Sequence, residues 1–141
     1  MDHKSGRYAA KQIDGTFPNC EHVIPKKTTK IGNVNTDQFK SEFHRVAYFA
    51  LNDVKFSAVR VEFSKTGCAI DFNGGSTRTK TGIDGSFSPT FWALDAKRLA
   101  LLLPAIEGDT FGVEATEDKE LGPIKIIDGN LMILLMPVRP N

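Results

Sequence analysis

The chain has 141 residues, which suits one domain of ordinary size. Hydrophobic residues make up 40% and charged residues 25%, and these globular values exclude a disordered or collagen-like chain. The 18 Lys and Arg residues nearly balance the 17 Asp and Glu residues, so a nucleic-acid contact would need a local cluster of basic side chains.

The N-terminal part is predicted to contain short extended pieces. Residues 8–13 favour a strand, and Asp14-Gly15 favours a turn after it. Residues 21–24 favour a second extended piece, which Pro25 ends because proline has no N–H to donate to a ladder. Residues 26–35 are polar and rich in turn formers, so we predict a loop or linker there.

A first helix is predicted from Thr36, which we interpret as its N-cap, with Asp37 at the positive end of the helix dipole. Asn52-Asp53 ends this helix. The apolar residues inside it have helical spacing and predict one buried face: Phe39, Phe43, Val46, Ala47 and Ala50.

From Val54 the apolar period changes to two, and β-branched and aromatic residues favour strands. Turn formers such as Asn73-Gly74-Gly75 separate these strands. The predicted strands of this region are residues 54–63, 68–72, 77–83 and 88–94.

A second helix is predicted to begin at Asp95 as N-cap and to end or kink at Pro104. Asp128-Gly129-Asn130 predicts a hairpin turn between the last two strands. The closing strands are residues 110–115, 123–127 and 131–138. The whole pattern is α+β, with two helices, each followed by antiparallel hairpins, in two similar halves that show no clear sequence repeat.

No catalytic motif is present in the sequence, and the three histidines have no ligand-like spacing, so we expect no enzyme, metal or cofactor. Most Asp residues lie at turns, where Asp is favoured for backbone reasons. The N-terminus has no apolar run, and the longest apolar stretch is far below the ~20 residues of a membrane helix. We therefore expect a soluble, cytoplasmic protein with Cys20 and Cys68 as reduced thiols.

The C-terminus, LMILLMPVRPN, is the most unusual segment, because residues 131–137 are all apolar or proline. Two interpretations stay open. A buried strand has this composition. A Met-rich and Leu-rich strand that ends at a proline also suits one wall of an apolar groove for partner peptides.

Several segments in order resemble the last domain of the bacterial sliding clamp, the beta subunit of DNA polymerase III. The C-terminal LLMPVR resembles the end of that family, and IDGTFPNCEHVIP (residues 13–25) resembles its passage from the middle to the last domain. FKSEFHRVAYFALNDVKFSAVRVEF resembles its first helix and next strand, LDAKRLALLLPAIEGDTFGVEATED its second helix, and GPIKIID a short late strand. The resemblance implies a tail and strand over residues 1–25 and a single DNA-clamp-like domain over residues 26–141.

The resemblance also implies a non-catalytic role in DNA replication. Clamp domains line up as a ring around double-stranded DNA without reading its sequence, and polymerases and the clamp loader insert short peptides into an apolar groove. The peptide-binding residues that the resemblance implies are Pro18, His22, Val23, Phe56, Asp95, Arg98, Ile124, Leu134, Leu135, Met136, Pro137, Val138 and Arg139. The clamp groove also needs residues from a middle domain, and no segment of this sequence resembles one. Three expectations stay open: a neighbouring copy supplies the missing wall, the groove is weakened, or the chain is a C-terminal fragment of a full-length clamp.

Two assemblies follow from this reading. In the first, copies join head to tail into a homo-oligomeric ring, and basic residues on the helices contact DNA phosphates. The candidates for this contact are Lys40, Arg45, Lys97 and Arg98. In the second, a monomeric or dimeric module binds peptides or clamp subunits and does not encircle DNA. The charged segment TRTK, residues 77–80, favours the second reading, because charged edge strands resist pairing.

Overall fold

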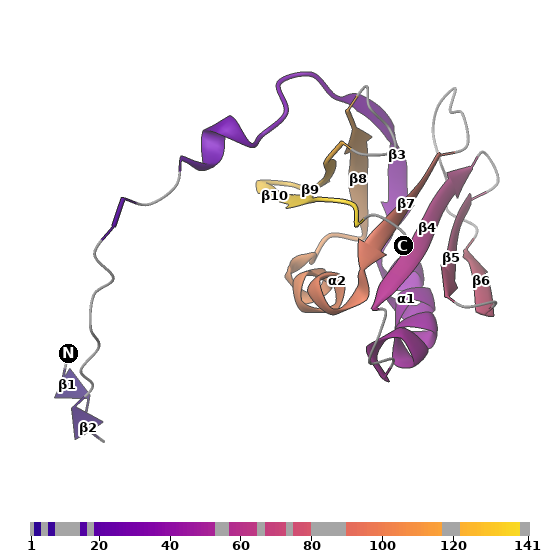
Figure 1. Ribbon diagram of the computed structural model, residues 1–141, viewed down its shortest axis with the longest axis horizontal. Helices are drawn as coiled ribbons and strands as arrows, with labels where there is room; N and C mark the ends of the chain where they lie inside the picture. Colours follow the sequence, from indigo (N-terminus) through magenta and orange to yellow (C-terminus); the bar gives the residue numbers. More distant parts are fainter. Residues whose placement is uncertain are drawn as a thin grey trace.

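The computed structural model describes residues 2–3, 6–7, 15–16, 19–52, 57–64, 67–72, 75–79, 90–116 and 122–138. Figure 1 shows an N-terminal portion that stands away from a body of helices and sheets. This portion includes a small sheet of β1 (Asp2–His3) and β2 (Gly6–Arg7) and the 3-10 helix η1 (Cys20–His22). We name residues 19–28, which lead into the body, the arm.

The body contains two four-stranded antiparallel sheets. The first has the order β10-β9-β8-β3, with β3 (Thr29–Asn35), β8 (Thr110–Ala115), β9 (Ile124–Asp128) and β10 (Leu131–Leu135). The second has the order β6-β5-β4-β7, with β4 (Ala58–Ser64), β5 (Gly67–Phe72), β6 (Gly75–Thr79) and β7 (Thr90–Asp95). Both helices, α1 (Thr36–Asn52) and α2 (Ala96–Leu102), lie at the same end of the body in Figure 1.

The chain order divides the body into two equivalent halves, as the sequence pattern predicts. Each half runs strand, helix and three strands: β3-α1-β4-β5-β6, then β7-α2-β8-β9-β10. The first strand of each half pairs with the sheet of the other half, because β3 pairs with β8 and β7 pairs with β4. The two halves are therefore interlocked through both sheets, and the described body is one packing unit.

The core between the sheets and helices is aromatic and β-branched. Trp92 and Phe43 are fully buried, and Phe39 meets Phe111 edge to face at 5.4 Å between ring centroids. Helix α1 packs on β5 and β6 and contacts α2. The 3-10 turn η2 (Leu103–Ala105) ends α2 at the predicted proline, which cannot continue the ladder of helical hydrogen bonds.

Two predictions for the N-terminal region are wrong. The predicted loop over residues 26–35 contains β3, which pairs with β8 over its whole length. Only Ile31 and Val34 supply its buried apolar side chains. A bulge between Lys30 and Gly32 also breaks the period of two, so the sequence shows no alternating pattern that would predict a strand. The predicted extended piece at residues 21–24 instead begins inside η1, which the Asn19 side chain caps by accepting a hydrogen bond from the Glu21 N–H at 3.0 Å.

The N-cap prediction for α1 is also wrong by one residue. The Asn35 side chain accepts a hydrogen bond from the Gln38 N–H at 2.9 Å, whereas Thr36 lies inside the helix and is buried. The predicted cap of α2 is confirmed, since Asp95 accepts from the N–H groups of Lys97 and Arg98. The predicted strand at residues 8–13, the start of the strand at residues 54–63, and the region 80–89 lie outside the described residues.

Candidate peptide-binding and assembly surfaces

Strand β10 divides its apolar residues between the core and the outer face of its sheet. Ile133 and Leu135 are buried, and Leu135 is opposite Ile124 on β9. Met132 is 41% exposed and lies opposite Ile127, while Leu134 is half-buried. Met136 follows the strand and is 59% exposed. Met132, Leu134, Met136 and Ile127 thus form an apolar patch, which we name the β10 patch.

The C-terminal segment after β10 is tied to the other sheet. The Val138 N–H donates to the Ala93 carbonyl at 2.8 Å, on the edge of β7 that does not face β4. Ala93 lies two residues before Asp95, or about 7 Å along the strand. The predicted wall residues Pro137 and Val138 therefore lie beside the start of α2, where Asp95 and Arg98 form an ion pair at 3.6 Å.

Not every predicted groove residue reaches a surface. Ile124 and Leu135 face the core and line a small apolar cavity of about 10 Å³. A cavity of that size holds at most about one water-sized sphere, and its apolar lining gives a water no partner. These two residues support the β10 patch from beneath rather than contacting a peptide themselves.

The predicted peptide-binding residues His22 and Val23 lie before β3 and are not part of β10. His22 and Val23 lie on the arm, and η1 contains no buried residue. Figure 1 shows η1 standing off the sheets. Pro18, Phe56 and Arg139 lie outside the described residues. The sequence missed Met132, although strict alternation within LMILLMP places Met132, Leu134 and Met136 on one face.

The four predicted DNA contacts differ in how far they are engaged within the chain. The Lys40 ammonium donates to the Ile106 carbonyl at 2.6 Å, and its side chain is half-buried. Arg45 pairs with Glu42 at 3.2 Å and Arg98 with Asp95 at 3.6 Å, and both arginine side chains remain largely exposed. Lys97 is exposed, and within the described residues its ammonium makes no ion pair.

Charged groups beside the β10 patch neutralise one another. Lys125 lies opposite Leu134 and donates to the Glu114 carboxylate at 3.1 Å. Thr28 donates to the same carboxylate at 2.5 Å. The Thr28 hydroxyl chiefly, and Lys125 after it, lower the pKa of Glu114. The two charges at the border of the patch, Lys125 and Glu114, are therefore paired with each other, which suits an apolar contact.

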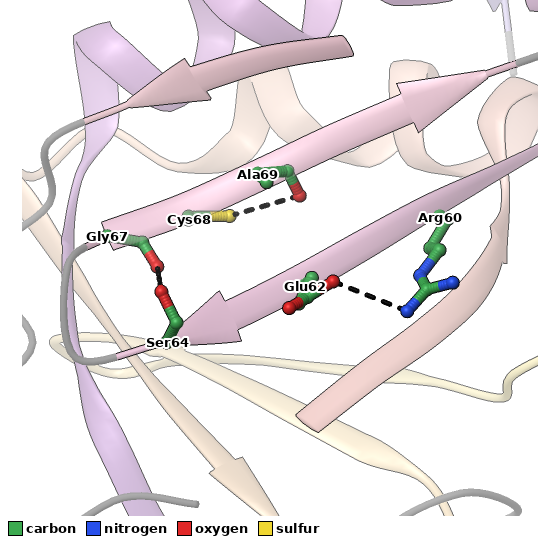
Figure 2. A network of polar contacts seen from close by, with 6 residues as sticks. All are labelled: Arg60, Glu62, Ser64, Gly67, Cys68 and Ala69. Carbon is green, nitrogen blue, oxygen red and sulfur yellow. Dashed lines mark hydrogen bonds and ion pairs between the residues drawn. The ribbon is translucent and has the colours of Figure 1, made fainter. Parts of the chain in front are cut away.

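The second sheet carries polar contacts of a structural kind, which Figure 2 shows. Arg60 pairs with Glu62 at 3.3 Å and lies over the Phe91 ring at 4.0 Å. Ser64 donates to the Gly67 carbonyl across the β4-β5 turn at 3.2 Å. Burial, aided by Asp71 and Glu62, raises the pKa of Cys68 to about 12, which leaves this thiol protonated and unreactive. Across the described residues, no three His, Cys, Asp or Glu side chains gather as metal ligands.

The comparisons with known proteins agree on one fold. No protein-family model matches the chain. The beta sliding clamp of Vibrio cholerae is 24% identical over 136 residues, which cover 94% of this chain and 37% of that protein. A DNA polymerase III beta-subunit sliding clamp from Bartonella birtlesii superposes with a TM-score of 0.76 at 23% identity, over 91% of this chain and 37% of that one. The chain has the fold of a sliding-clamp domain.

Other solved clamps give the same result. The Helicobacter pylori beta clamp bound to a DNA ligase peptide has a TM-score of 0.71 at 18% identity, over 90% of this chain and 34% of that chain. The chain thus spans little more than a third of the length of the clamps it matches. Within the described residues, none of the helices is long and apolar enough to cross a membrane.

Proposed function

We propose that this chain is a non-catalytic, cytoplasmic, sliding-clamp-like domain of DNA replication. Its activity is to hold short apolar peptides of polymerase or clamp-loader type on the β10 patch and to join other clamp-like domains. The observation that carries the proposal is a row of outward apolar side chains, with Met132 and Leu134 on the edge strand β10 and Met136 directly after it. The row lies next to the C-terminal segment that the Val138–Ala93 hydrogen bond joins to β7. A ligase peptide is bound to the Helicobacter pylori clamp of the same fold.

The patch suits a peptide for two physical reasons. Methionine side chains are flexible and polarizable, so they adapt to different apolar partners. Met132 and Leu134 also lie on a strand whose second edge is unpaired among the described residues, so alternate backbone groups are available to an extended peptide.

Titration of a short apolar clamp-binding peptide against the full chain tests this function. Met136→Glu places a charge in the patch without removing a buried side chain, and should weaken peptide binding by about tenfold or more. Leu101→Glu is the matched control, because Leu101 is exposed on α2, outside the patch. Equal losses for both variants, or no binding by the wild type, would contradict the proposal.

We further propose that copies or clamp subunits join through sheet edges. The strands β6 and β10 each form one edge of a sheet and are the equivalent last strands of the two halves. Strand-to-strand pairing of one copy's β6 with another's β10 would be a heterologous contact, which closes into a ring or continues as a filament. The resemblance to clamps favours a ring around DNA. Light scattering after size exclusion, with double-stranded DNA present or absent, tests this assembly.

A second candidate function is a peptide-binding or clamp-regulating module that does not encircle DNA. It is favoured by the engagement of Lys40, Arg45 and Arg98 within the chain, which leaves few free cations on the helices. Retention on DNA at low salt separates the two functions, because phosphate contacts are salt-dependent and sequence-independent. A chain that stays monomeric and ignores DNA, yet binds the peptide, has the second function.

A further inference from the structure

A glycine in the middle of β8 is not explained by the fold. The backbone at Gly112 is not in the left-handed region, and an added Cβ would meet its neighbours at ordinary distances from 3.6 Å. Two nearby glycines differ, because Gly129 has a φ of 55° and Gly108 is crowded by the Asp128 carboxylate. A glycine inside a strand weakens the strand and often marks a place where another backbone approaches closely. The absent side chain at position 112 therefore indicates a contact from outside the domain.

The outer face of the sheet is open at this glycine. Its neighbours Phe111 and Val113 point into the core, so Gly112 faces outward, on a strand that lies between β3 and β9 (Figure 1). Asn33 on β3 and Ile127 on β9 are its partners across the sheet. The Asn33 Oδ1 and Ile127 Cβ atoms lie 3.6 Å and 3.9 Å from the position of an added Cβ. Gly112 is thus the floor between two side-chain walls, and we name these three residues the Gly112 notch.

The walls of the Gly112 notch have the chemistry that a peptide backbone needs. The Asn33 side chain is half-buried, and within the part of the chain that the structure describes its amide makes no hydrogen bond. An amide offers one acceptor oxygen and one donor nitrogen, which complement the N–H and the C=O of a peptide group. The next outward residue of β8 is the carboxylate Glu114, which disfavours a phosphate at this place. The notch therefore suits an uncharged peptide group rather than nucleic acid.

The Gly112 notch continues the β10 patch, because Ile127 belongs to both and lies opposite Met132. Two strand spacings, or about 10 Å, separate Gly112 from β10. We propose that the notch is a second subsite for a peptide on the β10 patch, which crosses from Met132 over Ile127 to Gly112, where its backbone hydrogen-bonds to the Asn33 amide. This proposal rests on the proposed function, because it extends the same site.

Such a subsite recognises the length of a partner peptide more than its sequence. An extended chain covers about 10 Å with about three residues, so the peptide group over Gly112 lies about three positions from the residue that contacts Met132. The Asn33 amide binds main-chain groups, which every residue except proline offers in full. A partner peptide with an extended flank therefore gains affinity that a peptide of apolar residues alone does not have.

Three labelled peptides titrated with the full chain test this subsite by fluorescence anisotropy. The first is the ligase peptide that the Helicobacter pylori clamp binds, and the other two carry four further alanines at one end or the other. One extended peptide should bind the wild-type chain about fivefold more tightly than the first, the effect of about one hydrogen bond. Asn33→Ala removes the amide and Gly112→Val fills the notch, so each should abolish this gain and leave binding of the first peptide unchanged. Ala69→Val is the matched control, because Ala69 faces outward on β5 of the other sheet, and it should keep the gain.

Each other outcome overturns the proposal. Equal binding of all three peptides to the wild-type chain shows that no subsite receives the extension. A gain that survives in both Asn33→Ala and Gly112→Val shows that the extension binds elsewhere. If Gly112→Val lowers the mass of the chain in light scattering and leaves all three titrations unchanged, a second copy occupies the notch instead. In these cases binding of the first peptide keeps the proposed function, whereas binding of none of the three removes the proposed function too.

Discussion

Asn35 and Asp95 occupy equivalent places in the two halves of the domain, each as the last residue of a strand and the cap of the next helix. The residue after each cap also makes an equivalent bond. The Thr36 N–H donates to the Asp109 carbonyl at 3.0 Å, and the Ala96 N–H donates to the Ser57 carbonyl at 2.6 Å. Each carbonyl belongs to the residue before the strand that pairs with the capping strand. The two halves therefore share helix-start geometry although their sequences show no clear repeat.

The equivalence predicts similar costs for removing either cap. Asn35→Ala and Asp95→Ala should each lower the free energy of unfolding by about 1 kcal/mol, because each leaves helix N–H groups without their acceptor. Urea denaturation followed by the fluorescence of Trp92, the single tryptophan, measures this. Thr36→Val is the contrast, because the buried Thr36 hydroxyl has no hydrogen-bond partner among the residues that the structure describes. That variant should be as stable as the wild type or more so. If Thr36→Val lowers the free energy of unfolding as much as Asn35→Ala does, Thr36 and not Asn35 alone caps the helix.

The Asp128 carboxylate should make the domain acid-sensitive. The N–H of Gly108, and then that of Glu107, lower the pKa of Asp128 below its ordinary value of 3.8. Because the folded pKa is depressed, the stabilisation is complete above the unfolded pKa and is lost as pH falls through the folded pKa. Asp128→Asn should therefore lose less stability than the wild type between about pH 5 and pH 2. Urea midpoints across that range are the measurement, and parallel curves for the two proteins would contradict the assignment.

A side chain at position 108 would have little room, because the Asp128 carboxylate lies where its Cβ atom would stand. A Cβ at this position would meet the Asp128 Oδ1 atom, so Gly108→Ala must displace the carboxylate that caps the turn. We expect a loss of about 1 kcal/mol in the free energy of unfolding, because the moved carboxylate gives up its hydrogen bonds from the Glu107 and Gly108 N–H groups. Gly112→Ala is the matched control, since an added Cβ there meets its neighbours at ordinary distances from 3.6 Å. The prediction fails if both alanine variants unfold at the same urea concentration.

The two cysteines should differ in reactivity. Cys68 is buried and its pKa is raised to about 12, whereas Cys20 lies exposed on the arm. A thiol reagent at neutral pH should modify Cys20 in the native chain and reach Cys68 only after unfolding. The Cys20→Ser variant should then remain unmodified until denaturant is added. Rapid native reaction of that variant would show that the β4-β5 sheet opens.

The basic helix residues should separate into structural and DNA-facing groups. Lys40→Met should lower the stability of the fold, because it removes the donor to the Ile106 carbonyl and leaves that acceptor unpaired. Lys97→Glu should leave stability nearly unchanged and reduce retention on DNA at low salt, if the helices face DNA as the ring assembly requires. Thermal unfolding and a DNA-cellulose column measure the two effects. Unchanged DNA retention for Lys97→Glu would favour the module that does not encircle DNA.

The sequence by itself determined the elements whose signal is local. The regular spacing from Phe39 to Ala50 predicted α1, Asp95 and Pro104 predicted the start and the end of α2, and Asp128-Gly129-Asn130 predicted the last hairpin. The ordered motifs also carried the resemblance to a sliding-clamp domain, since family signatures are strings of residues.

Only the tertiary structure decided the features that depend on distant partners. Strand β3 exists because β8, about 80 residues later, supplies its ladder, and two buried residues and a bulge give no local period. From the sequence alone Lys40 is expected to be a solvated cation, because its hydrogen-bond partner, the Ile106 carbonyl, lies 66 positions away. For the same reason the sequence left open whether the apolar run at β10 is a buried strand or the wall of a groove. The pleat alternates Met132 and Leu134 outward with Ile133 and Leu135 inward, but only the pairing with β9 shows which set the core receives.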